Sequence, residues 1–322
     1  MRLLMTGAAG FMGRNAVLAV PPTWEVVAPV RPGNLGLRAF VRAHALKHVH
    51  VVDCDLTNDA MIRDMASHGG PSFDACLYLA SNTSIPDSIR RPAHDLTTNA
   101  IGLLNVLEHC AIGHLVYMSS GAVYIGLTGT VGPDSALSPD LPYAISKWAA
   151  EHYLRASVRH RGTPAAATII RFFGAFGPYE PERKLYTRLV RRFAFERDPH
   201  FTVLGDGENY IDAMYVDDAI RALLAVLEQP PRLPHPIRLV DMGLGGRETV
   251  TQVVERAARV FGLEPIVAHE GSSPEYITFS IDPDAFTSRY GVSPHISLED
   301  GLQRLAAHLR REPDREGEDG PH

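Results

Sequence analysis

The amino-terminal stretch constrains the fold of this chain more than any other segment. An apolar run, Leu3 to Met5, leads into TGAAGFMG, where Gly7, Gly10 and Gly13 accompany a helix-like pattern from Phe11 to Val20. A strand, a glycine turn and a helix in this order gather backbone N–H groups at the positive end of a helix dipole. Glycines also let a pyrophosphate approach the backbone closely. The stretch therefore predicts a dinucleotide-binding α/β fold, with a plain strand-to-helix turn as the alternative.

A second informative stretch, PYAISKWAAEHYL, runs from Pro142 to Leu154 and is rich in helix formers. Tyr143 and Lys147 are spaced i, i+4, so their side chains project from one helical face. Tyrosine titrates near pH ~10 and is a poor base at neutral pH unless a nearby positive charge favours the phenolate. Lys147 is placed to supply that charge, although such pairs also arise by chance on solvated helices.

A third stretch, HLVYMSSGAVY, contains an apolar strand that ends in Ser119 and Ser120. A hydroxyl at the carboxyl end of a parallel strand lies where open α/β sheets bind ligands. The chain resembles the extended short-chain dehydrogenase/reductase family, in particular its NAD-dependent epimerase/dehydratase group. The resemblance is carried by TGAAGFMG, Ser120, Tyr143 and Lys147, in this order. The resemblance covers nearly the whole chain. It implies a Rossmann-type, doubly wound parallel sheet with a smaller α/β substrate lobe on its C-terminal side.

The resemblance implies hydride transfer as the chemistry of this site. Tyr143 would exchange a proton with the substrate oxygen, and Ser120 would hydrogen-bond the same oxygen. Lys147 would favour the phenolate and bind the nicotinamide ribose. Asn99, within a helical pattern from Pro92 to Cys110, would belong to a water relay. A buried asparagine bonded only to backbone is the alternative for that residue.

The second strand, Glu25 to Val30, ends in Arg31, where NAD-dependent enzymes usually carry an acidic residue. An arginine there can accept a 2′-phosphate, so Arg31 favours NADP over NAD, and both are retained as candidate cofactors. An arginine that stacks on adenine or faces water is the alternative. The residues that we expect at the cofactor are Gly7, Gly10, Phe11, Met12, Gly13, Arg31, Asp55, Leu56, Leu79, Ala80, Ser81, Asn99, Tyr143, Lys147 and Phe173.

The substrate is less constrained than the cofactor. FGPYEPERKLYTRL resembles the segment that helps hold the nucleotide in sugar-nucleotide enzymes. However, Gly174 replaces an expected asparagine, and Ile211 and Ser272 stand where pyrophosphate-binding arginines are expected. Losing both arginines removes charge-assisted phosphate contacts. The residues that we expect at the substrate are Thr83, Ser120, Gly174, Arg183 and Lys184.

Three functions are compatible with these motifs. The favoured one is an NADP-linked ketone reductase or alcohol dehydrogenase of a sugar-like substrate, because both arginines are missing and Arg31 is present. The alternative is a UDP-, dTDP- or CDP-hexose 4-epimerase with tightly bound NAD. The third is a dinucleotide sensor without catalysis. A sugar 4,6-dehydratase is disfavoured, since Gly121 and Ala122 replace the acidic pair that water elimination requires.

Composition argues against several other classes of protein. A net charge of −6 disfavours general nucleic-acid binding. No apolar run approaches the ~20 residues of a membrane span, and no signal-peptide pattern precedes the first strand. The histidines and the widely spaced Cys54, Cys76 and Cys110 form no metal-ligand motif, so we expect no metal. We expect a cytoplasmic protein and, by resemblance, a homodimer formed by the helices of Asn99 and Tyr143.

The glycine- and proline-rich stretch that follows Phe173 predicts a change of organisation. We expect an NAD(P)-binding Rossmann domain in residues 1–173 and 216–242. A substrate-binding lobe is expected in residues 174–215 and 243–311. Residues 312–322 are charged and lack aromatic side chains, so they are expected to form a disordered tail.

Overall fold

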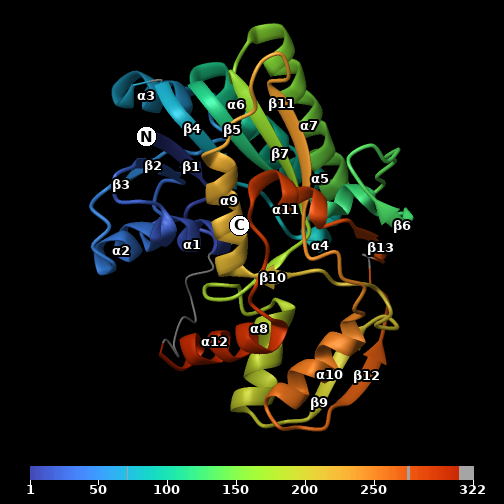
Figure 1. Ribbon diagram of the computed structural model, residues 1–322. Helices are drawn as coiled ribbons and strands as arrows, with labels where there is room; N and C mark the ends of the chain where they lie inside the picture. Colours follow the sequence, from blue (N-terminus) through green and yellow to red (C-terminus); the bar gives the residue numbers. More distant parts are fainter. Residues whose placement is uncertain (71, 274–275, 312–322) are drawn as a thin grey trace. The chain divides into compact units, whose positions relative to one another are not determined.

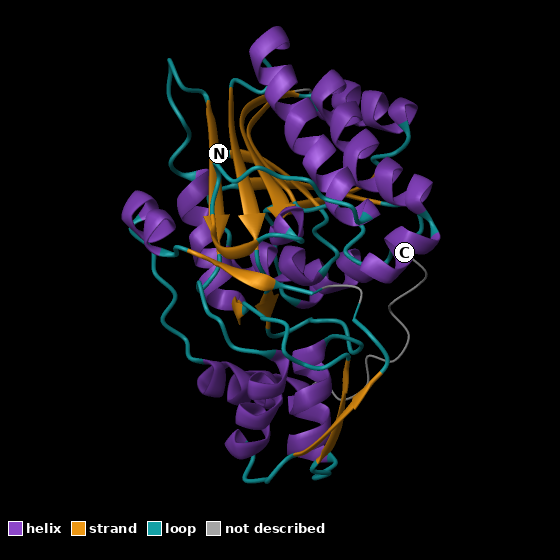
Figure 2. Cartoon of the chain, turned by 90° about the vertical axis from the view of Figure 1, so that its right-hand side faces the viewer, coloured by secondary structure: helices purple, strands orange, loops and turns teal. Residues whose placement is uncertain are grey.

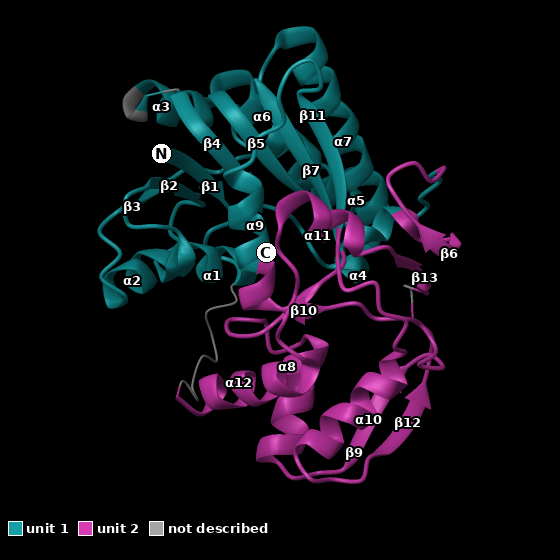
Figure 3. Cartoon of the chain, in the orientation of Figure 1, with its two compact units in different colours: residues 1–123, 137–172, 220–241 teal, residues 124–136, 173–219, 242–322 magenta. Residues whose placement is uncertain are grey.

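The computed structural model describes residues 1–70, 72–273 and 276–311, so the expected tail lies outside the described residues. The chain forms two compact units (Figure 3). Unit 1 comprises residues 1–123, 137–172 and 220–241, and unit 2 comprises residues 124–136, 173–219 and the described residues from 242 onward. The sequence-based ranges place 124–136 and 216–219 in the first domain, whereas both belong to unit 2. Residues 124–136 belong to unit 2 because their strand, Thr128–Val131, pairs with the distant strand Thr278–Ile281.

Unit 1 is built on a seven-stranded sheet with the order β11-β7-β5-β4-β1-β2-β3 (Figure 1). Every neighbouring pair from β7 to β3 is parallel. The strand order reverses between β1 and β4, the switch point at which open α/β sheets bind ligands. This order confirms the expected doubly wound α/β sheet. The strands are β1 (Arg2–Thr6), β2 (Glu25–Val30), β3 (Val49–Asp53), β4 (Ser72–Tyr78), β5 (Ala111–Ser120), β7 (Ala166–Phe172) and β11 (Ile237–Met242).

Helices cover both faces of this sheet (Figure 2). They are α1 (Phe11–Ala19), α2 (Gly36–Ala43), α3 (Asp59–Gly69), α4 (Ile85–Arg90), α5 (Pro92–Leu96), α6 (Gly102–His109), α7 (Pro142–Arg161) and α9 (Val216–Leu227). A π-helical segment, η1 (Thr97–Ile101), separates α5 from α6, and a 3-10 turn, η2 (Gly121–Tyr124), follows β5. The single helix predicted from Pro92 to Cys110 is therefore interrupted. Apolar side chains of α6, α7, β4 and β5 form one buried core.

The described residues of unit 2 form three two-stranded parallel sheets. They pair β6 (Thr128–Val131) with β13 (Thr278–Ile281), β8 (Ala175–Phe176) with β10 (Met214–Tyr215), and β9 (His200–Leu204) with β12 (Ile266–Glu270). Its further helices are α8 (Leu185–Val190), α10 (Val250–Val260), α11 (Asp284–Tyr290) and α12 (Leu298–Arg311), with a π-helical segment η3 (Arg191–Phe195). Phe176 stacks on Tyr186 with ring centroids 4.3 Å apart, which anchors α8 to β8.

The helices expected at a dimer interface expose apolar side chains. Leu96 of α5, Ile101 of η1, and Ile145 and Tyr153 of α7 are exposed. The homodimer itself stays a prediction. Within the described residues, no helix has both the length and the apolar content needed to cross a membrane. The three cysteines are buried free thiols.

A buried ion pair joins α7 to β7. Arg171 donates from Nη2 to Glu151 Oε2 over 2.8 Å and from Nε to Oε1 over 3.1 Å. Ser119 of β5 donates to the same carboxylate over 2.5 Å. The arginine and glutamate side chains are 4% and 1% exposed. Because a buried charge is tolerated only when it is paired and hydrogen-bonded, α7 is fixed against both strands.

Replacing Glu151 with alanine should therefore destabilise the protein strongly. Glu151→Ala leaves the Arg171 guanidinium buried without the Glu151 carboxylate, and we expect a loss of about 3–5 kcal/mol in the free energy of unfolding, measured by urea denaturation. Glu25→Ala removes an exposed partner of Arg2 and should change stability little. A double change, Glu151→Leu with Arg171→Met, should recover much of the loss. Equal effects of Glu151→Ala and Glu25→Ala would contradict the assigned pair.

Candidate functional site

The glycine turn after β1 is shaped by close backbone contacts. Gly7 has φ +70°, and an added Cβ would lie 2.7 Å from the Ala80 nitrogen. A Cβ on Gly13 would lie 2.2 Å from the Gly7 carbonyl oxygen, so α1 packs directly on the turn. Thr6 Oγ1 accepts hydrogen bonds from the N–H groups of Leu79 and Ala80, both over 3.2 Å. The turn is thereby attached to the end of β4.

Gly10 differs from the other two glycines of the turn. Its φ is −80°, which any residue adopts, and it is the N-cap of α1 without a side-chain cap. An added Cβ would meet only the Gly7 carbonyl oxygen, at the ordinary distance of 3.4 Å. Phe11 and Met12 open the helix and are half-buried. The backbone at Gly10 is therefore open to a ligand while Gly7 and Gly13 maintain the turn.

Ser120, Tyr143 and Lys147 come from two packed elements of unit 1. Ser120 is the last residue of β5, and its Oγ accepts a hydrogen bond from the Ala122 N–H over 3.1 Å. Tyr143 and Lys147 lie near the start of α7, which packs against β5. The Lys147 ammonium donates to the Met118 carbonyl of β5 over 2.8 Å. The structure thus brings Lys147 onto the strand that ends at Ser120.

The Lys147 ammonium is buried, with 3% of the residue exposed. Its Nζ lies 5.2 Å from the centroid of the Tyr117 ring, a cation–π contact. Burial lowers the pKa of Lys147 to about 7, and the carboxylates of Asp95 and Glu151 oppose this shift. Tyr143 is also buried, at 9% exposure. Burial of Lys147 therefore favours the neutral amine, and the two carboxylates favour the charged ammonium.

Asn99 lies in the π-helical segment η1 and is fully buried. Its Oδ1 accepts from Ser81 Oγ over 2.9 Å and from the Asn82 N–H over 2.8 Å. Its Nδ2 donates to Ser146 Oγ over 2.9 Å and to Asp95 Oδ1 over 3.1 Å. The structure thus brings Asn99 and Ser81 into direct contact. The side chain bonds to other side chains as well as to backbone, so the backbone-only alternative is wrong.

Sequence reasoning missed Asp95, which is fully buried on α5. Burial raises its pKa, and hydrogen bonds from Ser146 and Asn82 and the charge of Lys147 oppose that shift. The only sequence signal was the i, i+4 spacing of Asp95 and Asn99. Ser146 was likewise overlooked, although it precedes Lys147 on α7 and joins the same network.

The residues expected at the adenine end follow neighbouring strands of the sheet. Arg31 follows β2 and is exposed. Asp55 and Leu56 follow β3, where Asp55 Oδ1 accepts from the Thr57 N–H over 2.9 Å. The Leu56 carbonyl accepts from Asn105 Nδ2 over 2.9 Å. Since carboxyl ends of parallel strands share one edge, these residues and the glycine turn lie at the same edge of unit 1.

Other expected residues lie in unit 2. The Phe173 N–H donates to the Met242 carbonyl over 3.1 Å. Gly174 has φ +148°, a conformation that side chains disfavour, which gives a local reason for glycine in place of asparagine. Arg183 and Lys184 are exposed just before α8. Thr83, expected at the substrate, is exposed in unit 1.

Comparison with protein families identifies the chain. Residues 3–240 match the sequence model of the NAD dependent epimerase/dehydratase family. The chain belongs to this family. Family membership confirms the resemblance drawn from the glycine turn and from Ser120, Tyr143 and Lys147.

Individual relatives of this epimerase/dehydratase family member differ in the reactions for which they are named. A dTDP-glucose 4,6-dehydratase of Streptomyces niveus is 26% identical over 94% of this chain and 90% of that protein. An uncharacterized UDP-glucose epimerase of Bacillus subtilis, YtcB, is 25% identical over 96% of this chain and 98% of that protein. The solved structure of DesIV, a dTDP-glucose 4,6-dehydratase of Streptomyces venezuelae with NAD and TYD bound, superposes with a TM-score of 0.82, 26% identity and 97% coverage of both chains.

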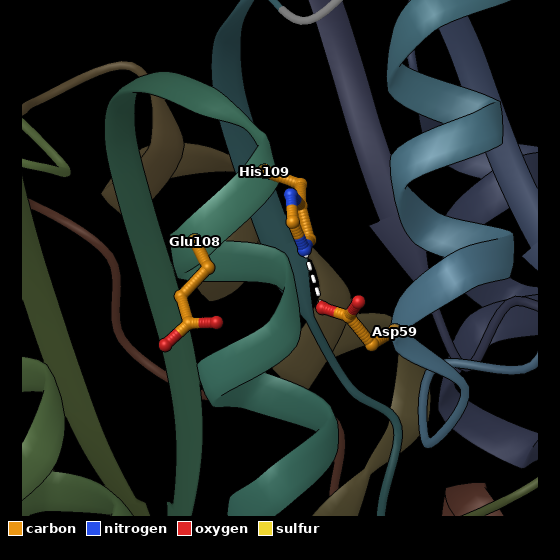
Figure 4. Close-up of side chains that lie close together, drawn as sticks. All are labelled: Asp59, Glu108 and His109. Carbon is orange, nitrogen blue, oxygen red and sulfur yellow. Dashed lines mark hydrogen bonds and ion pairs between the residues drawn. The ribbon is translucent and has the colours of Figure 1, made fainter.

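Within the described residues, one group of potential metal ligands lies in unit 1, and none of its members is among the expected site residues (Figure 4). Candidate ligand atoms of Asp59, Glu108 and His109 lie within 4.8 Å of one another. His109 Nε2 and Asp59 Oδ1 are 2.5 Å apart, and Arg63 Nη2 also donates to Asp59 over 2.5 Å. The hydrogen bond from His109 and the charge of Arg63 lower the pKa of Asp59. A guanidinium would compete with a cation for this carboxylate, so we assign no metal to the group.

The two kinds of glycine in the turn predict different effects of alanine on stability. Gly13→Ala forces a methyl group into backbone atoms of the turn and should lower the free energy of unfolding by about 1–3 kcal/mol. Gly10→Ala adds a methyl group at an ordinary contact distance and should cost less than about 1 kcal/mol, the small penalty of alanine in place of glycine at a helix N-cap. Thermal unfolding of both variants tests this difference, and a Gly10→Ala loss as large as that of Gly13→Ala would contradict it.

Proposed function

We propose that this chain is an NAD-dependent epimerase of nucleoside-diphosphate sugars, with Ser120, Tyr143 and Lys147 as its catalytic residues. The observation that carries the proposal is the buried Lys147 ammonium, one helical turn from Tyr143 and hydrogen-bonded to β5. A positive charge in this place favours the phenolate that a tyrosine base requires. Family membership and the relatives named for nucleotide sugars support the same reading.

The chain's own residues fit a dinucleotide. Gly10 leaves the start of α1 open, and a helix start without a side-chain cap is suited to phosphate oxygens. Arg31, Asp55 and Leu56 would hold the adenosine end, and Leu79, Ala80 and Ser81 would flank the nicotinamide end. When bound, NAD supplies the acceptor for a substrate hydride and later the donor that returns it. Lys147 would hydrogen-bond the nicotinamide ribose in this arrangement.

Each catalytic side chain has a defined task in epimerisation. Tyr143, as phenolate, removes the hydroxyl proton of the sugar carbinol while the carbon loses its hydride, which leaves a ketone. Ser120 donates a hydrogen bond to that oxygen and holds it beside Tyr143. The ketone sugar then rotates in the site and presents its opposite face. Tyr143 returns the proton to the carbonyl oxygen as hydride reaches that face of the carbon. The sugar is inverted at one carbon, and no net oxidation or reduction occurs.

The relatives support this epimerase, the alternative of the sequence-based interpretation, better than the ketone reductase that the sequence favoured. The missing arginines, at Ile211 and Ser272, were the main argument for a reductase. We propose instead that Arg183 and Lys184, exposed before α8, bind the diphosphate, and that Thr83 and Gly174 border the sugar. Dehydration, the reaction for which several relatives are named, is disfavoured because Gly121 and Ala122 of η2 provide no acid or base.

The proposal is tested by incubating the purified protein with UDP-glucose and with dTDP-glucose, without added dinucleotide, and following the sugars by proton NMR. An epimerase interconverts two hexoses without loss of water. Arg183→Ala with Lys184→Ala should raise KM and leave NAD binding unchanged. Formation of a deoxy-ketosugar would identify a dehydratase, and turnover that consumes stoichiometric NADPH would identify a reductase; either outcome overturns the proposal.

Removing the Tyr143 hydroxyl should abolish most of the activity. We expect Tyr143→Phe to lower kcat by about 10²–10⁴-fold, since proton transfer then lacks its positioned base. NAD binding, measured by calorimetry, should persist. Tyr153→Phe on the exposed face of the same helix is the matched control and should turn over normally. Full activity of Tyr143→Phe would refute the assignment.

Arg31 gives a separate test of the cofactor. We propose NAD as the physiological dinucleotide, following the family description, and Arg31 as the residue that would contact a 2′-phosphate when NADP binds. Arg31→Ala should weaken NADP binding at least about tenfold, the loss of a charge-assisted phosphate contact, and NAD binding much less. Calorimetric titration of both dinucleotides measures the difference. Equal losses of NADP and NAD affinity would show that Arg31 does not contact the 2′-phosphate.

A further inference from the structure

Asp95 is a buried carboxylate that the proposed chemistry does not use. It accepts hydrogen bonds from Ser146 Oγ over 2.5 Å, from Asn82 Nδ2 over 2.8 Å and from Asn99 Nδ2 over 3.1 Å. Within the described part of the chain, all of its hydrogen-bond donors are therefore neutral side chains. A carboxylate that is completely buried without a cationic hydrogen-bond partner requires compensation from elsewhere.

Within the described residues, Lys147 is a buried cation that has no carboxylate among its hydrogen-bond acceptors, which complements the situation of Asp95. Its buried ammonium donates to the Met118 carbonyl and lies over the Tyr117 ring, both of which are neutral. Glu151 also interacts with it electrostatically. However, Arg171 already neutralises Glu151 through two hydrogen bonds. Of the two carboxylates that act on Lys147, Asp95 is therefore the one without a cationic hydrogen-bond partner.

The helices that carry the two groups, α5 and α7, pack on each other. Ser146, which bonds to Asp95, directly precedes Lys147 in the sequence. The other titratable groups that face the pair are His94 on α5, Glu151 on α7 and Tyr117 on β5. Of these, Glu151 is paired and Tyr117 is neutral at ordinary pH. The charges of Asp95 and Lys147 also influence each other's protonation.

We propose that Asp95 is the buried counter-charge of Lys147 and a positioning residue that sets the pH range of the Tyr143–Lys147 pair. The negative charge keeps the proton on Lys147 to higher pH than burial alone would allow. A protonated Lys147 in turn favours the Tyr143 phenolate. Asp95 thus acts on catalysis through Lys147, without touching the substrate. The catalytic consequence rests on the proposed function, whereas the charge pairing does not.

The geometry also identifies a conservative variant. In Asp95→Asn the amide oxygen still accepts from Asn82 and Asn99, while the new NH₂ group donates to Ser146 Oγ. Ser146 is then able to turn its own hydroxyl to the Tyr143 carbonyl oxygen, 3.0 Å away. The substitution therefore removes the charge and preserves the hydrogen-bond pattern. Glu108→Gln, which removes a carboxylate from the exposed face of α6, is the matched control.

Lys147 can be observed directly because the chain contains only Lys47, Lys147 and Lys184. Protein labelled with ¹³C at lysine Cε gives one NMR signal for each, and Lys47→Arg and Lys184→Arg assign the other two. Relative to wild type, Asp95→Asn should lower the titration midpoint of Lys147 by about 1 pH unit or more. Glu108→Gln should leave it in place. An unchanged midpoint in Asp95→Asn overturns the proposal.

A wild-type measurement tests the pairing even if Asp95→Asn does not fold. When Asp95 takes up a proton at acid pH, the nearby Lys147 signal should shift again, above the usual aspartate range because burial raises the Asp95 pKa. The Lys47 and Lys184 signals should show no such inflection. Absence of the second inflection at Lys147 also overturns the proposal.

The pH profile of kcat connects the pairing to catalysis. Loss of a negative charge lowers the pKa of both Tyr143 and Lys147, so both limbs of the profile should move to lower pH in Asp95→Asn. A purely structural defect would lower kcat without moving the limbs, and that result overturns the positioning role. A shifted Lys147 midpoint in a protein without activity on nucleotide sugars would refute the proposed function alone.

Discussion

The buried ion pair between Arg171 and Glu151 fixes the helix on which the proposed chemistry depends. Separating two buried charges is costly, so α7 is fixed to β7 and, through Ser119, to β5. Lys147 lies one turn before Glu151 on that helix. The ion pair therefore also holds Lys147 in position for its hydrogen bond to the Met118 carbonyl. A helix held only by apolar contacts would have more freedom to slide along the sheet.

Most of the sheet could be predicted because each strand is an apolar run with clear limits. β2 spans Glu25–Val30, as predicted, because the apolar residues stop at Arg31-Pro-Gly. The spacing of apolar residues did not predict the break in the helix expected from Pro92 to Cys110, because that break is a change in backbone hydrogen bonding. The π-helical segment around Asn99 is a local change of backbone hydrogen bonding inside a helical stretch, and the residue types give no sign of it. The assignment of residues 124–136 to the first domain was wrong for another reason. These residues pair with a strand near residue 280, and the local sequence carries no sign of such a distant partner.

The site shows the same division between local and long-range information. Ser120, Tyr143 and Lys147 could be proposed as site residues because short motifs place them on a strand end and a helix start. Asp95 and Ser146 were missed because their hydrogen bond joins segments about fifty residues apart. A network of this kind is a property of packing, and each member looks ordinary in sequence. The residues that surround a motif are thus harder to predict than the motif itself.

Each unit is assembled from separate stretches of chain, which has a consequence for how the protein is made. β11, the outer neighbour of β7, is translated only after residues 173–219 of unit 2. Until then β7 is an edge strand with unpaired backbone groups on the nascent chain. The last strand of the central sheet therefore joins it late in synthesis. Neither unit corresponds to one continuous stretch of the sequence, so neither is complete until the later stretches of chain have been made.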